Sequence, residues 1–459
     1  MPTLIFGACR YKYLFTVDRC DTAETVVSNG PRSPKRHRIS PRPGMTYCAF
    51  NNSNRLTPKC VAMEIFSFKL TDVGRFTELD IQLAPTAKHP SNVTVLVGEN
   101  GAGKTTLLKS LATSLSWLAA RIRTEKGNGN HLANEDIRNG ASLATVTIAV
   151  VGRSQIRSGL TDAVPEDILF IWTTTRERQG RKSVVHSQLT DVSRLADHYR
   201  NQLTANDKAS LPLIAYYPVE RSVLEIPLKI RTKHTFDQLD GYDHSLNRRV
   251  DFRQFFAWFR EREDSENETG VSDTALAEIS EKFGKDSDIW KTLFQLQASS
   301  RDRQLTAVRS AIAAFMPGFS NLRLQRKPRL HMAIDKEGMT LNIAQLSQGE
   351  KSMMALVGDI ARRLAMMNQS LDNPLEGDGI VLIDEVDLHL HSKWQRSLIR
   401  QLSETFPNCQ FVLTTQSPLV ISDTKDVLVY VLDDGNRPKH WQRTTRHQAP
   451  PGDTTVEEL

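Results

Sequence analysis

Residues Val93–Leu108 read VTVLVGENGAGKTTLL, so a strand-like run passes into three glycines within six positions and then into Lys-Thr-Thr. Glycine is unfavourable inside both strands and helices, so the backbone of this loop must do something that side chains would prevent. The loop fits the pattern G-x-x-x-x-G-K-[ST] and precedes a run that can form a helix. A glycine-rich loop at a helix N-terminus directs several N–H groups at one point, where the helix dipole also favours an anion. The stretch therefore predicts a cradle for the phosphates of a nucleotide.

Two side chains of this phosphate loop have specific expected roles. Lys104 is expected to reach the β- and γ-phosphates, and the Thr105 hydroxyl is expected to bind Mg²⁺. A tight turn that is merely rich in glycine would not require the preceding strand, the lysine and the threonine together. The residues expected to bind the nucleotide phosphates are Gly98, Glu99, Asn100, Gly101, Ala102, Gly103, Lys104, Thr105 and Thr106.

The composition is that of an ordinary globular protein. The chain has 459 residues, of which 39% are hydrophobic and 24% charged, and its length suits two or three domains. No apolar run approaches the ~20 residues that a membrane span needs. The first residues are mixed in character and do not predict a signal peptide. We expect a cytoplasmic protein without a membrane partner.

The net charge of +6 comes from the first 62 residues. That segment has ten Lys or Arg and three acidic residues, whereas residues 63–459 have 49 basic and 50 acidic ones. It includes GPRSPKRHRISPRPG (residues 30–44), which is too rich in proline and arginine to pack. The segment is either a flexible basic arm that contacts nucleic acid or a stretch upstream of the true start at Met63, and we favour the second. The basic charge is therefore no evidence that the main body binds nucleic acid.

Cysteine is also concentrated in that segment. Four of the five cysteines lie there, at Cys9, Cys20, Cys48 and Cys60, and no two form a C-x-x-C pair. A zinc site would need closer pairing, so we expect reduced thiols.

From Met63 onward, strand-like and helix-like segments alternate, which predicts an α/β fold with a largely parallel sheet. Strands are expected at 63–70, 77–83, 93–97, 142–151, 169–175, 214–221, 322–325, 330–334, 379–385, 410–415 and 427–432, and helices at 105–115, 347–367 and 394–405. Between about 236 and 311 the pattern is helical. We expect an N-terminal extension (1–62), a first lobe (63–221), a helical insertion (222–315), a second lobe (316–445) and a tail (446–459).

The segment GIVLIDE, residues 379–385, is an apolar run that ends in two carboxylates. A buried parallel strand is apolar throughout, and ligand-binding groups lie at its C-terminal end. Asp384 is expected to bind Mg²⁺, directly or through water, and Glu385 to poise the attacking water for phosphoryl transfer. Strands that merely end in surface acids are common, but the phosphate loop earlier in the chain favours the catalytic interpretation.

A second helix N-terminus is expected at LSQGE, residues 346–350, which we call the signature loop. Ser347 can cap the helix, and Glu350 three residues later would complete a capping box. Gly349 lets the backbone approach another group closely. Such an end can bind an anion, and its expected binding residues are Ser347, Gln348, Gly349 and Glu350.

In this order, the segments resemble the ABC-type ATPase head: GENGAGKT as Walker A, LSQGE as signature, IVLIDE as Walker B, VDLHLH as D-loop and TTQS as switch. The resemblance spans about residues 63–435. It implies a P-loop NTPase fold, interrupted by a helical insertion, that binds and hydrolyses ATP with Mg²⁺. The family places the signature of one subunit against the Walker A loop of another. This implies a homodimer or larger homo-oligomer in which each loop is half of a site.

Some positions depart from the family pattern. The switch residue, usually His, is Gln416 here, which can hydrogen-bond a γ-phosphate but carries no charge and would suit slow hydrolysis or tight ATP binding. The Q-loop position of the family falls near Arg221. His389 and His391 could form a metal pair, but the resemblance implies that they are packing residues of the D-loop. The expected catalytic residues are Lys104, Glu385 and Gln416.

Within the ABC ATPases, transporters usually carry LSGGQ, and the chain instead resembles the RecF/SMC/OLD branch of DNA-linked ATPases. The runs YYPVERSV, FRQFFAWFREREDSENE and LIDEVDLHLHSKWQ are most similar to PtuA-like ATPases of Septu and retron anti-phage systems. This resemblance implies an ATPase that regulates a partner HNH nuclease of the PtuB type, with DNA or another nucleic acid contacted through the complex. No second acidic cluster or H-N-H-like set is visible in the sequence, so cutting is expected from the partner. The alternatives are a RecF/SMC-like repair or chromosome-maintenance ATPase and, less expected, a transporter ATPase subunit.

Overall fold

The computed structural model describes residues 63–155, 165–178, 186–220, 236–246, 252–269, 273–432 and 439–440. These residues belong to one compact unit, Val61–Leu459. The expectations for residues 1–62, for the tail 446–459 and for Arg221 fall outside the described residues. No helix of the described part is long and apolar enough to cross a membrane.

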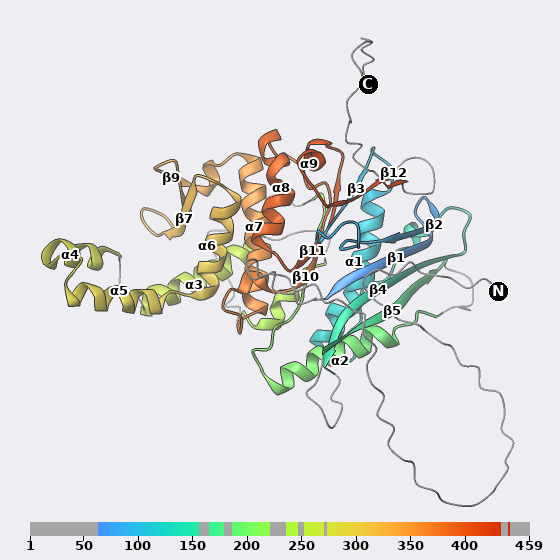
Figure 1. Cartoon of the computed structure of the whole chain (residues 1–459), viewed down its shortest axis with the longest axis horizontal. Helices are drawn as coiled ribbons and strands as arrows, with labels where there is room; N and C mark the ends of the chain where they lie inside the picture. The colour runs from blue at the N-terminus through green and yellow to red at the C-terminus, as the bar shows by residue number, and fades with distance from the viewer. Residues whose placement is uncertain are drawn as a thin grey trace, which may run out of the picture. The chain divides into compact units, whose positions relative to one another are not determined.

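A six-stranded sheet, which we call the central sheet, carries the phosphate loop (Figure 1). Among the described residues, its strands run parallel except for β13 at one edge. Three strands are buried at every residue, which explains the apolar sequences of β6 and β10, while the buried polar residues of β11, such as Gln410 and Thr414, form hydrogen bonds. The loops that follow parallel strands leave from one edge of the sheet, so they can form a common site. The order is β13 (Lys439–His440), β12 (Leu428–Leu432), β3 (Val93–Gly98), β11 (Cys409–Thr415), β10 (Gly379–Ile383) and β6 (Leu213–Tyr217).

A second sheet is antiparallel. Its order is β2 (Phe76–Gln82), β1 (Glu64–Val73), β4 (Leu143–Gln155) and β5 (Pro165–Glu177). The buried side chain of Gln410 joins it to the central sheet: Nε2 donates to the carbonyls of Ile65 (2.9 Å) and Ala84 (2.7 Å), and Oε1 accepts from the Ile65 N–H (2.8 Å). The central sheet, in which the described strands other than β13 run parallel, confirms the prediction of a largely parallel sheet. The strands β1 and β2 are antiparallel because a tight turn joins them.

Helix α1 (Lys104–Arg123) lies between the two sheets, where it contacts β4 of one and β3, β6, β10 and β11 of the other. It is buried around most of its circumference, as a helix between two layers must be. Helix α2 (Thr190–Ala205) packs on α1 and β5. Helix α7 (Gln348–Met367) packs against β6, and the remaining helices of the second lobe are α8 (Ser392–Thr405) and α9 (Leu419–Ser422).

The predicted helical block is confirmed. Its helices are α3 (Phe252–Thr269), α4 (Asp273–Phe283), α5 (Asp288–Ser300) and α6 (Arg303–Phe315), and α6 packs along α7. Helices α4 and α5 pack on each other as a hairpin, which lies at the left in Figure 1. A small antiparallel sheet follows, with the order β7 (Phe319–Gln325), β8 (His331–Lys336) and β9 (Met339–Asn342).

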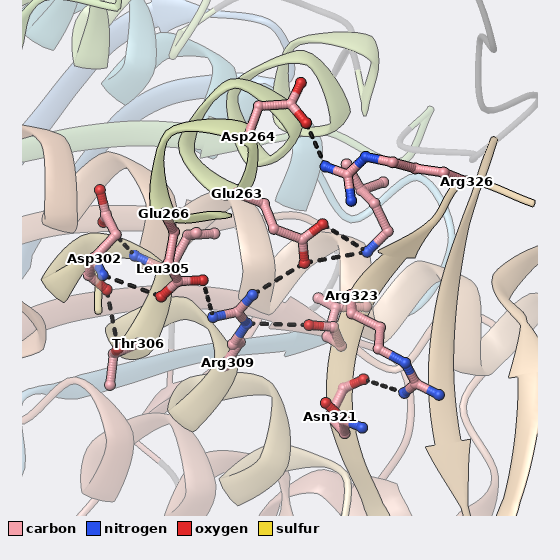
Figure 2. Close-up of polar contacts among 12 residues, drawn as sticks. Glu263, Asp264, Glu266, Asp302, Leu305, Thr306, Arg309, Asn321, Arg323 and Arg326 are labelled. Carbon is pink, nitrogen blue, oxygen red and sulfur yellow. Dashed lines mark hydrogen bonds and ion pairs between the residues drawn. The ribbon is translucent and has the colours of Figure 1, made fainter. Parts of the chain in front are cut away.

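A cluster of charged residues fixes the base of this hairpin (Figure 2). The Glu263 carboxylate of α3 accepts from Arg309 of α6 (3.0 Å) and from the Leu324 N–H of β7 (2.9 Å). Arg309 also donates to Glu266 (2.8 Å), which accepts from the Asp302 N–H (3.0 Å). Burial raises the pKa of Glu263, and the Leu324 N–H and Arg309 oppose that rise. The end of α3 and the start of α6 are thus held together on β7.

Four of the labelled helices and strands are missed by the sequence analysis: α2, β9 and the short elements α9 and β13. Helix α2 buries Val192, Leu195, Ala196 and Tyr199, whose spacing is helical, so the signal was present in the sequence. Strand β9 is short and has no fully buried residue, so no alternation of polar and apolar residues marks it. Short 3₁₀ turns occur at Asn134–Asp136, Gln238–Tyr242, Ile343–Gln345 and Pro374–Glu376.

Candidate active site

The phosphate loop depends on glycine for both its conformation and its close packing. Gly101 and Gly103 have φ values of +84° and +92°, in the left-handed region. A Cβ at Gly103 would lie 2.6 Å from the ring of Phe76, and one at Gly98 would lie 2.6 Å from the Leu432 carbonyl oxygen. Arg75 donates to the Gly101 carbonyl (2.6 Å) and holds the loop from the β1–β2 turn. The loop is therefore fixed by contacts to both sheets.

Lys104 is folded back onto the phosphate loop. Its Nζ donates to the carbonyls of Gly98 (2.7 Å) and Glu99 (2.9 Å), and the residue is 5% exposed. Burial lowers the pKa of Lys104, while the charges of Glu385 and Asp384 oppose that change. A lysine ammonium at a helix N-terminus is suited to bind an anion, because the ammonium and the helix end both carry positive charge.

The two carboxylates after β10 are held by neighbouring strands. Asp384 is fully buried; its N–H donates to the Tyr217 carbonyl (2.9 Å), and its Oδ1 accepts from the Thr414 hydroxyl (2.5 Å). The Glu385 N–H donates to the same hydroxyl oxygen (2.7 Å). Glu385 has a φ of +43°, an uncommon conformation for a residue with a side chain, and such strain clusters at functional sites.

Gln416 connects these carboxylates to the phosphate loop. Its Nε2 donates to Glu385 Oε1 (2.8 Å) and to Asn100 Oδ1 (2.8 Å). Residues from three separate stretches of sequence, namely the phosphate loop, the end of β10 and the end of β11, are thus brought to one edge of the central sheet. This is the edge at which parallel sheets bind ligands.

The capping box of the signature loop is confirmed. Ser347 Oγ accepts from the Glu350 N–H (3.3 Å), and Glu350 Oε2 accepts from the Ser347 N–H (2.8 Å). Lys336 of β8 donates to the other oxygen of Glu350 (2.7 Å). Although burial acts in the opposite direction, these contacts with Lys336 and Ser347 lower the pKa of Glu350. The exposed Ser347 and Gln348 lie at the start of α7.

The D-loop lies against the signature loop of the same chain. A Cβ at Gly349 would lie 2.3 Å from the His389 carbonyl oxygen, so the close approach predicted for this glycine is confirmed. His389 has a φ of +63°, and His391 Nδ1 accepts from the Lys393 N–H (3.4 Å) at the start of α8. The described residues contain no group of three or more His, Cys, Asp or Glu that could hold a metal ion.

The structure does not bring every predicted site residue together within one chain. Among the hydrogen bonds of the described residues, none joins Ser347–Glu350 to Gly98–Thr106. Three supporting residues were not predicted from the sequence, namely Thr414, Tyr217 and Arg75. Thr414 lies inside the quoted TTQS run and Tyr217 inside the quoted YYPVERSV run, but the sequence analysis assigned neither a role, and Arg75 lies in no quoted run.

The expected donors fit ATP and Mg²⁺. Mg²⁺ prefers hard oxygen ligands, and the Thr105 hydroxyl and the Asp384 carboxylate supply them. A Cβ at Gly101 would meet no atom within 4 Å, so the loop has open space beside its backbone at this position, as a phosphate ligand requires.

Comparison with known proteins agrees with this arrangement. The family model described as "AAA domain, putative AbiEii toxin, Type IV TA system" matches residues 93–422. "Retron Ec83 probable ATPase" of Escherichia coli is 34% identical over 381 residues, which cover 75% of this chain and 68% of that protein. "Retron Vc95 probable ATPase" of Vibrio cholerae serotype O1 biovar El Tor is 33% identical over 390 residues, with 80% and 73% covered. "Septu protein PtuA" of Bacillus mycoides (strain KBAB4) is 38% identical over 90 residues, with 20% and 12% covered.

Two solved structures are also similar. An SMC head bound to the C-winged helix domain of ScpA matches with a TM-score of 0.41 and 14% identity, covering 82% of this chain and 97% of that one. The recombination mediator protein RecF matches with a TM-score of 0.40 and 14% identity, covering 83% and 99%. TM-scores below 0.5 support no further conclusion.

The family model matches more than half of the chain, and the chain covers more than two thirds of each retron relative. The resemblance to retron-associated and PtuA-like ATPases is therefore confirmed. The chain is an ATPase that belongs to this AAA-domain family, in which its relatives include the retron ATPases.

Proposed function

We propose that the chain hydrolyses ATP between two copies of itself and thereby regulates a partner nuclease in anti-phage defence. The observation that carries this proposal is that two helix ends expected to bind anions share no described hydrogen bond. The phosphate loop shares one sheet edge with Glu385 and Gln416, while Ser347 caps a different helix and forms no described hydrogen bond with that loop. Each helix end would then be half of a nucleotide site. The arrangement of the ABC-type family, in which the signature of one subunit lies against the Walker A loop of another, would complete both sites.

In the proposed reaction each residue has one task. Lys104 and the backbone of the phosphate loop bind the phosphates, and the ammonium offsets the charge that develops during transfer. Glu385 accepts the proton of the attacking water. Gln416 holds the Glu385 side chain in place, because its amide donates hydrogen bonds to both Glu385 and Asn100. Mg²⁺, held by Thr105 and Asp384, would neutralise phosphate charge. Ser347, Gln348, Gly349 and Glu350 of the second copy would close the site.

The defence role is inferred from the relatives, two of which are named as retron ATPases and another as a Septu protein. We propose that the nuclease is an HNH-type partner, as the resemblance to PtuA-like ATPases implies. DNA or another nucleic acid would be contacted through the complex of the two proteins. We also propose the lobe boundaries given above, with 222–315 as the insertion, and a cytoplasmic location.

The α4–α5 hairpin supports the presence of a protein partner. Phe283, Ile289, Phe294 and Leu296 are 54%, 51%, 47% and 52% exposed. The ring of Phe294 stacks on Trp290 with centroids 4.8 Å apart, so the surface has an ordered aromatic pair. Several exposed large apolar side chains on one small element are typical of an interaction surface.

Complementation between two inactive variants tests the shared site. Lys104→Ala removes the phosphate lysine, and Ser347→Arg blocks the signature loop. Each homodimer should be inactive, whereas a mixture should form one intact site per heterodimer and regain part of the ATPase activity. Thr204→Arg, at the exposed end of α2, controls for adding an arginine and should not need complementation. If mixtures that exchange subunits never regain activity, the two-copy site is wrong.

A further inference from the structure

Tyr217, the last residue of β6, is held at both its side chain and its backbone. Its hydroxyl donates to Asp359 Oδ2 of α7 (3.0 Å). Its carbonyl accepts from the N–H of Asp384 (2.9 Å), the residue that follows β10. In the parallel register Tyr217 lies opposite Ile383, so the strand pairing delivers it to this position. One residue thus contacts both α7 and the backbone of Asp384, whose carboxylate is assigned to Mg²⁺.

The other end of this link is a buried ionic cluster within α7. Arg362 donates to Asp359 Oδ1 (2.7 Å), and Arg363 donates to Asp359 Oδ2 (2.7 Å). Arg363 also donates to the carbonyls of Gly241 (2.6 Å) and Asp243 (3.0 Å). Asp359, Arg362 and Arg363 are at most 4% exposed. Burial opposes ionisation, but the two guanidinium groups outweigh it and hold the pKa of Asp359 far below its usual range.

Such a cluster is poorly explained by stability alone. Removing three charged groups from water is costly, and an apolar core of similar volume is often as stable. What the cluster supplies is a fixed orientation, since each oxygen of Asp359 is bound from a defined direction. The Tyr217 hydroxyl meets the same oxygen that Arg363 holds. Tyr217 therefore cannot shift along α7 without breaking a buried hydrogen bond.

Helix α7 begins at the signature loop. Asp359 follows Ser347 by twelve residues, which is about 18 Å along a helix at 1.5 Å per residue. The helix is continuous from Gln348 to Met367 and buried along most of its course, and a packed helix of this kind can transmit a displacement between its ends. Its position at the signature end and its position at Tyr217 are consequently linked.

We propose that Tyr217 is a positioning residue that ties α7 to Asp384 and so sets this carboxylate for turnover. The inference rests on the proposed roles of Ser347 and Asp384. Tyr217 does not touch the reacting groups itself. Its effect should fall on kcat more than on ATP affinity, because the phosphate contacts come from the separate loop Gly98–Thr106.

Tyr242 provides a matched control. It is also buried, and its hydroxyl donates to the Pro212 carbonyl (2.8 Å), with no described contact to Asp359 or Asp384. Tyr217→Phe and Tyr242→Phe each remove one buried hydroxyl without opening a large cavity. Both variants of the full chain should show similarly lowered Tm values. Tyr217→Phe alone should reduce kcat about tenfold at 25 °C while the Kd for ATP changes less than twofold.

An unchanged kcat in Tyr217→Phe would overturn the proposal, because the hydroxyl would then have no role in turnover. An equal loss of kcat in Tyr242→Phe would also overturn it, because the loss would then be a general effect of removing a buried hydroxyl. Light scattering of the wild type with and without a non-hydrolysable ATP analogue tests the two-copy site separately. Failure of the wild type to pair refutes that site, while the comparison of kcat values decides the positioning role.

Discussion

Gln416 donates one hydrogen bond to Glu385 and another to Asn100, each 2.8 Å long. The amide therefore ties the expected general base to the phosphate loop. A histidine at this position could bear a positive charge toward a γ-phosphate, whereas glutamine offers a hydrogen bond only. The geometry thus supports a site that orients its groups well but adds no charge at the switch position, which suits slow turnover.

Lys104→Ala should abolish tight nucleotide binding. The ammonium is buried against two carbonyls of the loop, and its loss leaves phosphate charge uncompensated. Truncating one partner of a buried charge pair costs about 2–5 kcal/mol, which corresponds to roughly 30-fold or more in affinity. Fluorescence titration with ATP and Mg²⁺ measures this. Lys126→Ala, at an exposed position beyond α1, should bind as the wild type does. Near-wild-type affinity in Lys104→Ala would refute the phosphate-loop assignment.

The features that could be predicted from the sequence are mostly local ones, which residues close together in the chain determine. The capping box at Ser347 and Glu350 is local and could be identified from three-residue spacing. The glycine pattern identified the phosphate loop, but not that Phe76 and Leu432 are the groups that exclude a side chain there. Tyr217 and Thr414 support the acidic pair only after the strands align in register. Contacts of that kind depend on tertiary pairing, so no spacing in the sequence reveals them.

Stability should depend on pH through Glu350. Its pKa is lower in the folded protein than in the unfolded chain, so its contribution is present above the unfolded pKa and is lost as pH falls through the folded value. Glu350→Gln removes the charge and the ion pair with Lys336. The variant should be less stable than the wild type at pH 7, by about 1 kcal/mol. The difference should shrink as the pH approaches ~4 and below.

Thermal unfolding of both proteins between pH 7 and pH 3.5 tests this expectation. Glu404→Gln, on the exposed side of α8, serves as control and should track the wild type throughout. A gap between wild type and Glu350→Gln that stays constant over this range would show that the carboxylate charge is irrelevant to the helix start.

The exposed apolar side chains of the α4–α5 hairpin should be needed for binding the proposed partner and not for ATP hydrolysis. Replacing Ile289 and Phe294 together by serine removes exposed side chains, so folding stability should change little. ATP turnover of the isolated chain should persist, while copurification of the co-expressed HNH-type partner should be lost. Met339→Ser changes a side chain that is 61% exposed on β9 and should leave the partner bound. Undiminished copurification in the double variant would exclude a role of these side chains in binding the partner.

Glu385→Gln should separate ATP binding from hydrolysis. Glutamine preserves the shape of the side chain and leaves Asp384 in place, but it cannot take a proton from water. Turnover should fall by about two to four orders of magnitude, the range for a positioned general base. ATP binding should survive, because the phosphate contacts belong to the loop that holds Lys104. A phosphate-release assay and an ATP titration measure the two effects on the same sample.

The same variant tests ATP-driven pairing. Because unhydrolysed ATP stays bound and is expected to bind the pair better than the single chain, mass action should shift Glu385→Gln toward larger assemblies. Light scattering with and without ATP measures the shift, and Glu404→Gln should hydrolyse ATP and not accumulate in the larger form. Normal turnover in Glu385→Gln would remove Glu385 from the mechanism. An inactive variant that binds ATP yet keeps its size would instead refute pairing, while leaving Glu385 as the base, because proton transfer needs only the contacts that one chain supplies.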